Sequence, residues 1–163
     1  MKEILFHAKR IDNNQWVEGF LSFIYTAGRN SNGFIHTDKA KIYSPEDVRS
    51  HDVYTATVGQ FTGKIGKNNK KIFQGDITEL TLESGEVRRF VVDIRTVTRT
   101  IVSHPDFDDE TAKVEITGVV FLWKGYELFP CIDSSGASNV SRMVVIGNIY
   151  DNPELIDEGG VLQ

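Results

Sequence analysis

The stretch KIFQGDITELTLESGEVRRFVVDI, residues 71–94, decides the fold class of this chain. Its centre, ESGE at 83–86, has the composition of a tight chain reversal. Apolar residues recur with period two on both sides of that reversal: Leu80, Leu82, Phe90, Val92 and Ile94. Because side chains alternate between the two faces of a strand, the pattern predicts two antiparallel strands and a mainly β protein.

The same signals continue towards the N-terminus. EILFHA at 3–8 and QWVEGFLSFIYT at 15–26 are rich in β-branched and aromatic residues and predict strands. The turn residues DNN at 12–14 lie between them and predict a second hairpin. One short helix is expected over YSPEDVRSH, residues 43–51, because Ser44 can cap a helix that begins at a proline.

Towards the C-terminus, KVEITGVVFLWKGYELFPCI at 113–132 predicts strands that break near Lys124-Gly125. SRMVVIGNIY at 141–150 predicts another strand, in which Gly147 marks a bulge or a close backbone approach. A succession of strands with short turns over residues 69–150 suggests a small barrel. We therefore expect an N-terminal β-rich part, 1–58, and a β-barrel part, 59–163, which could form one integrated domain.

Composition narrows the class of protein. A net charge of −5 over 163 residues argues against nucleic-acid binding by the whole surface. Cys131 is the only cysteine, so no intrachain disulfide can form, which fits a cytoplasmic location. The longest apolar run, GVVFLW at 118–123, is far shorter than the roughly 20 residues that a membrane helix requires. No membrane partner is expected.

The lysine-rich stretch GQFTGKIGKNNKKIFQGDI, residues 59–77, suggests two readings. It fails the phosphate-loop motif, because only three residues separate Gly59 from Gly63-Lys64 and no hydroxyl residue follows the lysine. It could bind nucleic acid with stacking faces from Phe61 and Phe73. The alternative is a solvated turn whose phenylalanines lie in the core. The candidate nucleic-acid ligands are Lys64, Lys67, Lys70 and Lys71.

Other side chains give weaker evidence for a metal, catalytic or ligand-binding site. The histidines share no metal-ligand spacing: His7, His36, His51 and His104. The acidic run lacks the glycine and distal glutamate of a calcium loop: Asp106, Asp108, Asp109 and Glu110. Cys131 follows a proline in an apolar segment and is expected to be a buried, inert thiol. Trp16 and Trp123 are expected in the core, with exposure for ligand binding as the alternative. No catalytic, metal or cofactor residues are assigned.

Three segments together resemble the YopX-like family of small phage and prophage proteins. They are KEILFHAKRIDNNQWVEGFL at 2–21, VGQFTGKIGKNNKKIFQGDI at 58–77 and VIGNIYDNPELI at 145–156. One departure is Asn68-Asn69, where the family pattern has an Asn-Gly turn, although asparagine also tolerates positive φ. The resemblance implies a mainly β fold with an SH3-like barrel in the C-terminal part and a function that is uncharacterised. It supplies no catalytic residues.

These observations favour a non-enzymatic phage or prophage accessory protein in the host cytoplasm, which binds an unknown protein partner or self-associates. The first alternative is a nucleic-acid-binding module that uses residues 64–71. The second is an enzyme whose site is assembled from distant histidines and carboxylates, and a cleft with convergent ionisable groups is the feature that it requires.

Overall fold

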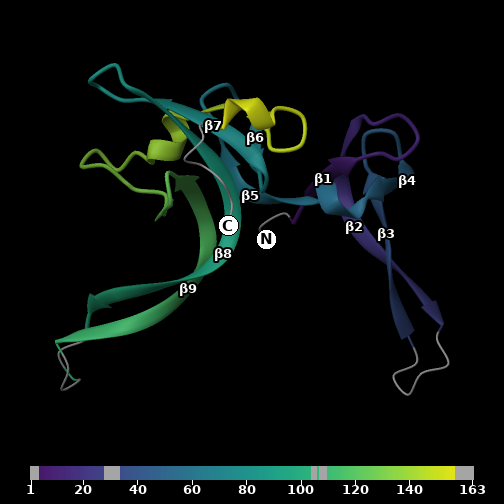
Figure 1. Ribbon diagram of the computed structural model, residues 1–163, viewed down its shortest axis with the longest axis horizontal. Coiled ribbons are helices and arrows are strands. Elements are labelled where there is room, and N and C mark those ends of the chain that lie inside the picture. The colour runs from purple at the N-terminus through teal and green to yellow at the C-terminus, as the bar shows by residue number, and fades with distance from the viewer. Residues whose placement is uncertain (1–3, 28–33, 104–105, 107–109, 157–163) are drawn as a thin grey trace. The chain divides into compact units, whose positions relative to one another are not determined.

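The computed structural model describes residues 4–27, 34–103, 106 and 110–156 (Figure 1). The chain forms two compact units. Unit 1 contains residues 1–65 and 71–75, and unit 2 contains residues 66–70 and 76–163. The boundary predicted from the sequence, between residues 58 and 59, falls inside unit 1, immediately before a strand.

Unit 1 is built on a six-stranded antiparallel sheet with the order β4-β3-β2-β1-β5-β6. Its elements are β1 (Phe6–Lys9), β2 (Trp16–Ala27), β3 (Phe34–Ser44), β4 (Arg49–Tyr54), the 3₁₀ turn η1 (Thr55–Thr57), β5 (Gly59–Ile65) and β6 (Lys71–Phe73). The expected β1–β2 hairpin is confirmed, with Phe6 opposite Gly19 and Lys9 opposite Trp16. A single bridge, Arg10 to Val53, also connects the end of β1 to the edge strand β4.

The helix expected over residues 43–51 is wrong. Residues 45–48 form a turn, and the flanking residues continue β3 and β4, with Ser44 opposite Arg49 and Ile42 opposite His51. Two turns of helix provide few hydrogen bonds and are unstable without packing. Ser44 instead lies buried in the strand, so the residue expected to cap the helix belongs to the sheet.

The core of unit 1 is made of small and branched side chains. Ala8, Ala40, Ile42 and Val53 are buried together, and half-buried apolar residues from β1, β2 and the η1–β5 connection pack against them. Strands β2 and β3 approach so closely at Gly19 that a β-carbon there would lie 2.0 Å from the Tyr43 carbonyl oxygen. Only glycine fits this position without a shift of the backbone.

Unit 2 is built on a five-stranded antiparallel sheet with the order β10-β9-β8-β7-β11. Its elements are β7 (Asp76–Thr81), β8 (Val87–Val102), β9 (Thr111–Trp123), β10 (Tyr126–Leu128), the 3₁₀ turn η2 (Asn139–Arg142), β11 (Val144–Asn148) and the 3₁₀ turn η3 (Pro153–Leu155). Within the described residues no ladder connects β10 to β11, so this sheet is open and no barrel closes. No helix in the described part of the chain is long and apolar enough to cross a membrane.

The hairpin of residues 71–94 is confirmed as β7 and β8, with Ile77 opposite Val91 and Thr81 opposite Val87. Beyond Val91, β8 continues without interruption to Val102 and pairs with β9 as far as Thr111. Figure 1 shows the two strands leaving the rest of their sheet as a long curved ribbon. We call residues 93–102 and 111–120, which pair only with each other, the β8–β9 ribbon.

The bulge predicted at Gly147 is confirmed. The register of β11 against β7 shifts between Val145 and Gly147. The close neighbour of Gly147 is a side chain rather than backbone, because a β-carbon there would lie 2.5 Å from the Asn152 amide oxygen. The break predicted near Lys124-Gly125 is a turn between β9 and β10.

Replacing Gly19 with alanine should destabilise the protein by at least about 1–3 kcal/mol, because the new methyl group collides with backbone rather than with a movable side chain. Chemical unfolding followed by circular dichroism measures the change. Gly118→Ala is the control, since its β-carbon would meet only a Phe129 ring carbon at 3.7 Å. Equal stabilities of the Gly19→Ala variant and the unchanged protein would show that β2 and β3 are not held at this distance.

Candidate functional site

The four candidate lysines do not share one environment. Lys64 lies half-buried on β5, and Lys71 on β6 forms an ion pair with Glu18. Lys67 and Lys70 are exposed on the turn at residues 66–70, which belongs to unit 2. The structure therefore divides the lysines between the two units, two in each.

The two phenylalanines that flank the lysines lie within unit 1. Phe73 is buried and Phe61 is half-buried, with their ring centroids 5.5 Å apart. Phe73 also stacks on the imidazole of His7, at 4.0 Å between centroids. Phe73 is thus part of the packed interior, as the reading of this stretch as a solvated turn requires.

The turn at residues 66–70 is held in place by main-chain contacts within unit 2. The Lys67 amide donates to the Met143 carbonyl oxygen at 2.7 Å, and the Asn68 side-chain amide donates to the Val145 carbonyl oxygen at 3.1 Å. Asn69 has a φ of 58°, the left-handed conformation that asparagine tolerates. The backbone at Lys67 is therefore fixed beside the segment that joins η2 to β11.

A polar cavity of about 340 Å³ lies beside this anchored turn. Its walls come from the turn, β7, η2 and β11: Lys67, Glu79, Thr81, Ser141, Arg142 and Val144. We call it the Lys67–Arg142 cavity. Arg142 donates a hydrogen bond to the Thr81 carbonyl oxygen at 3.4 Å, and Glu79 forms an ion pair with Arg89 at 3.1 Å. Two cationic side chains and a neutralised carboxylate therefore surround the space.

Unit 1 contains a larger cavity, of about 470 Å³, with both polar and aromatic walls. We call it the His7–His51 cavity. Aromatic rings come from His7, Trp16 and Phe73, and the His7 and Trp16 centroids lie 4.5 Å apart. The polar residues in its wall are Arg10, Gln15, Glu18, Ser44, Glu46, Asp47 and His51.

The charged groups around the His7–His51 cavity are largely paired with each other or with neighbours. The His51 Nε2 atom lies 2.8 Å from an Asp47 carboxylate oxygen, and the Arg10 Nε atom donates to Asp12 at 2.9 Å. Glu18 is held by Lys71. Hydrogen bonding to Arg10 lowers the pKa of the exposed Asp12 carboxyl.

Burial dominates the chemistry of His7. Desolvation lowers its pKa from 6.5 to about 4, and a hydrogen bond to the Gln74 backbone opposes this shift. Its Nε2 atom is buried without a hydrogen-bond partner among the described residues. That edge of the ring faces Gly59, where a β-carbon would lie 2.8 Å from Nε2. His7 is therefore a neutral, stacked ring at neutral pH.

Sequence reasoning missed two partnerships. Arg142 lies 75 positions after Lys67, and only the long-range contact of the turn with Met143 brings the two together. Asp47 lies in the turn at residues 45–48 and His51 lies four residues later on β4, within the range expected to be helical. No signal in the sequence marks the first pairing. The second could have been found by treating residues 45–48 as a turn.

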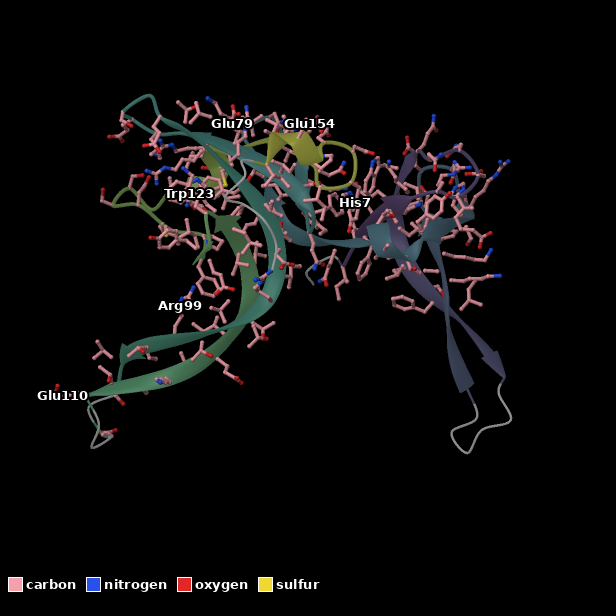
Figure 2. The ribbon with its side chains drawn as sticks, in the orientation of Figure 1. His7, Glu79, Arg99, Glu110, Trp123 and Glu154 are labelled. Atoms are coloured by element: carbon pink, nitrogen blue, oxygen red, sulfur yellow. The ribbon has the colours of Figure 1, made fainter. Side chains whose placement is uncertain are left out.

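The cysteine, tryptophan, histidine and acidic candidates from the sequence differ in burial and surroundings. Cys131 is exposed, which corrects the expectation of a buried thiol, because it lies in a loop outside the sheet. Trp16 and Trp123 are half-buried, and the Arg88 guanidinium lies 4.5 Å from the Trp123 ring centroid (Figure 2). Several predictions lie outside the described residues or side chains: His36, His104, Asp108 and Asp109. The described residues contain no cluster of three or more potential metal ligands.

The lowered pKa of His7 predicts a defined loss of stability in acid. The unfolded chain binds a proton below about pH 6.5, whereas the folded protein binds it only below about pH 4. Stability should therefore fall as the pH drops through this window, by up to roughly 3 kcal/mol from this residue. His7→Phe keeps the aromatic stack and should remove this component. Urea unfolding of both proteins from pH 8 to pH 4 measures the difference, and parallel stability curves would contradict the assignment.

Comparison with known proteins identifies the family of the chain. None of the curated proteins matches the chain. A family model described as YopX protein matches residues 6–157, which is nearly all of the sequence and includes both β-rich units. The chain is therefore a member of the YopX protein family.

Proposed function

We propose that this protein is a non-enzymatic accessory protein of a phage or prophage, which acts in the host cytoplasm by associating with a second copy of itself through the β8–β9 ribbon. The observation that carries the proposal is the amphipathic character of this ribbon. One face is apolar, with Ile101 45% and Ile116 39% exposed. The opposite face is rich in threonine: Thr96, Thr98, Thr100, Thr111 and Thr117.

The register of the two strands creates these faces. Val97 lies opposite Ile116, Arg99 opposite Val114 and Ile101 opposite Ala112, so these side chains point to the same side. The intervening positions hold five threonines together with Ile94, Val102, Lys113, Glu115 and Val119, and the hydroxyl oxygens of Thr96 and Thr117 lie 2.7 Å apart. A two-stranded ribbon is only marginally stable in water without a covered apolar face. A partner on that face would stabilise it.

The charges near the apolar face are already neutralised within unit 2. Arg95 donates to Asp93 at 2.8 Å and to Glu127 at 3.1 Å. Arg99, labelled midway along the ribbon in Figure 2, donates to the Glu127 carbonyl oxygen at 2.7 Å. Its guanidinium also lies 5.3 Å from the Phe129 ring centroid. Covering this face therefore leaves these arginines paired, which lowers the cost of removing them from water.

A second copy is the occupant that this surface favours. The ribbon is an antiparallel pair with one apolar face, and a surface of this kind can pair with its own copy across a twofold axis. Within the described residues, the outer edges of both strands also lack partner strands along the ribbon, and such edges are common sites of association.

Pairing of the ionisable groups supports a non-enzymatic role. The His7–His51 cavity does bring histidines and carboxylates together, which is what the enzyme alternative requires. However, His51 is bonded to Asp47, Glu18 is paired with Lys71, and the His7 Nε2 edge faces Gly59. None of these groups is arranged as a nucleophile with an adjacent base.

The SH3-like barrel that the resemblance implies for residues 59–163 remains part of the proposal. The tight turns of unit 2 and its open five-stranded antiparallel sheet are compatible with a partly open barrel. In unit 1, the bridge from Arg10 to Val53 and the hydrogen bond from the Ile11 amide to the Asp52 carbonyl oxygen, at 3.0 Å, bring the edge strand back towards β1.

Replacing Ile101 and Ile116 together with threonine should weaken self-association by about tenfold or more, because two apolar side chains leave the interface while strand propensity is kept. Sedimentation velocity over a wide range of protein concentration measures the effect. The matched control is Thr98→Ser with Thr100→Ser, on the opposite face of the same strand, which should leave association unchanged. A strictly monomeric unchanged protein would refute the proposal, as would equal association of the isoleucine variant.

The second candidate function is nucleic-acid binding through Lys64, Lys67, Lys70 and Lys71. The observation in its favour is the anchored, exposed turn that carries Lys67 and Lys70. Binding should weaken steeply as salt is added, because the lysines would displace counterions from phosphates. Changing Lys67, Lys70 and Lys71 to glutamate should abolish it in a fluorescence-anisotropy titration with a labelled oligonucleotide. Unchanged affinity of the triple variant would exclude this function for the turn.

A further inference from the structure

We infer that the Lys67–Arg142 cavity of unit 2 is a binding site for a phosphoryl group, carried either by a small phosphate ester or by a nucleic-acid backbone. The inference does not depend on self-association. It narrows the second candidate function from a stretch of four lysines to one lysine and an arginine distant in the sequence.

The positions of the two cations are set by the fold. The Lys67 amide donates to the Met143 carbonyl oxygen at 2.7 Å, so its backbone lies next to the residue that follows Arg142. The Asn68 side chain adds a hydrogen bond to Val145, which fixes the other side of the turn. Arg142 is directed to the end of β7 by its hydrogen bond to the Thr81 carbonyl oxygen. Both side chains line the same cavity.

The balance of charge in the cavity favours an anion. Lys67 and Arg142 form no ion pair within the described residues. The one carboxylate in the wall, Glu79, is paired with Arg89 at 3.1 Å. A second carboxylate, Asp133, lies outside the cavity wall. A hydrogen bond from Ser135 is the largest cause of its lowered pKa, and Ala137 and Arg142 contribute less. Two like charges held beside one cavity repel each other, and a bound dianion would relieve this repulsion.

The available donors suit phosphate oxygens. The guanidinium of Arg142 has five N–H groups in a planar fork, and its bond to Thr81 leaves several available. Lys67 supplies an ammonium group, and the exposed Thr81 hydroxyl can donate at the rim. Ser141 does not contribute a donor, since its hydroxyl donates to the Ser138 carbonyl oxygen at 2.6 Å. The volume, about 340 Å³, admits a phosphoryl group with part of the molecule that carries it.

The test is an amide NMR titration of the full chain with three probes: inorganic phosphate, adenosine 5′-monophosphate and an oligothymidylate without terminal phosphates. We expect saturable shifts at the amides of Lys67, Thr81 and Arg142 with at least one probe. Lys67→Gln and Arg142→Gln should each weaken that binding by about tenfold or more, since each removes a charge-assisted hydrogen bond. Lys70→Gln, on the same turn but outside the cavity wall, is the matched control and should bind as the unchanged protein does.

The probes also identify the source of the phosphoryl group. Binding of phosphate and the mononucleotide alone indicates a small ester, whereas oligonucleotide binding that both glutamine variants lose indicates a diester backbone. The inference fails if no probe shifts these amides, if both glutamine variants bind as tightly as the unchanged protein, or if Lys70→Gln causes the same loss. Phosphate binding that survives the glutamate change at Lys70 and Lys71 would support this site independently of the four-lysine nucleic-acid function, which the oligonucleotide titration of the same variant tests separately.

Discussion

Main-chain hydrogen bonding between strands is the constraint on which this structure depends. Within the described residues, the only helical elements are three short 3₁₀ turns. Buried backbone amides and carbonyls must therefore find their hydrogen-bond partners on other strands or in turns. In both units this need is met by antiparallel ladders, most of them between consecutive strands, while β1–β5 in unit 1 and β7–β11 in unit 2 join strands far apart in sequence. Where a strand is longer than its neighbours, as β8 is beyond Val91, one edge stays open in the described residues. The proposed interface arises from that mismatch of length.

The same constraint explains the position of the Lys67–Arg142 cavity. A reversal between β5 and β6 must satisfy its own backbone groups, and the Lys67 amide does so on Met143 rather than within the turn. A contact made for hydrogen bonding therefore places a lysine beside an arginine. The positive charges of Lys67 and Arg142 repel each other. This repulsion costs the folded protein little stability, because both side chains are exposed and water screens their charges.

Local sequence pattern was sufficient to predict the β7–β8 hairpin from period-two apolar residues and the β1–β2 hairpin from the turn residues between its strands. It also predicted the bulge at Gly147 from a glycine within a strand, although the register involved is that of β11 against the distant β7. It failed at residues 43–51, where a serine and a proline resemble a helix start but strand pairing across the turn dominates. The approach of Lys67 to Arg142 could not be predicted, since it depends on a register between segments that only the folded chain brings together. Burial of His7 was equally hidden, because it results from stacking on Phe73, which is distant in sequence.

The division of the chain into units has a consequence for its biosynthesis. Unit 1 includes residues 71–75, yet the five residues immediately before them belong to unit 2. A nascent chain that has emerged only as far as residue 65 therefore lacks β6, and the turn at 66–70 lacks Met143 and Val145 until nearly the whole chain has been translated. No single cut yields two complete fragments. A cut after residue 75 removes residues 66–70 from unit 2, a cut before residue 66 removes β6 from unit 1, and a cut between them damages both units, so complementation between fragments would need segments that overlap across residues 66–75.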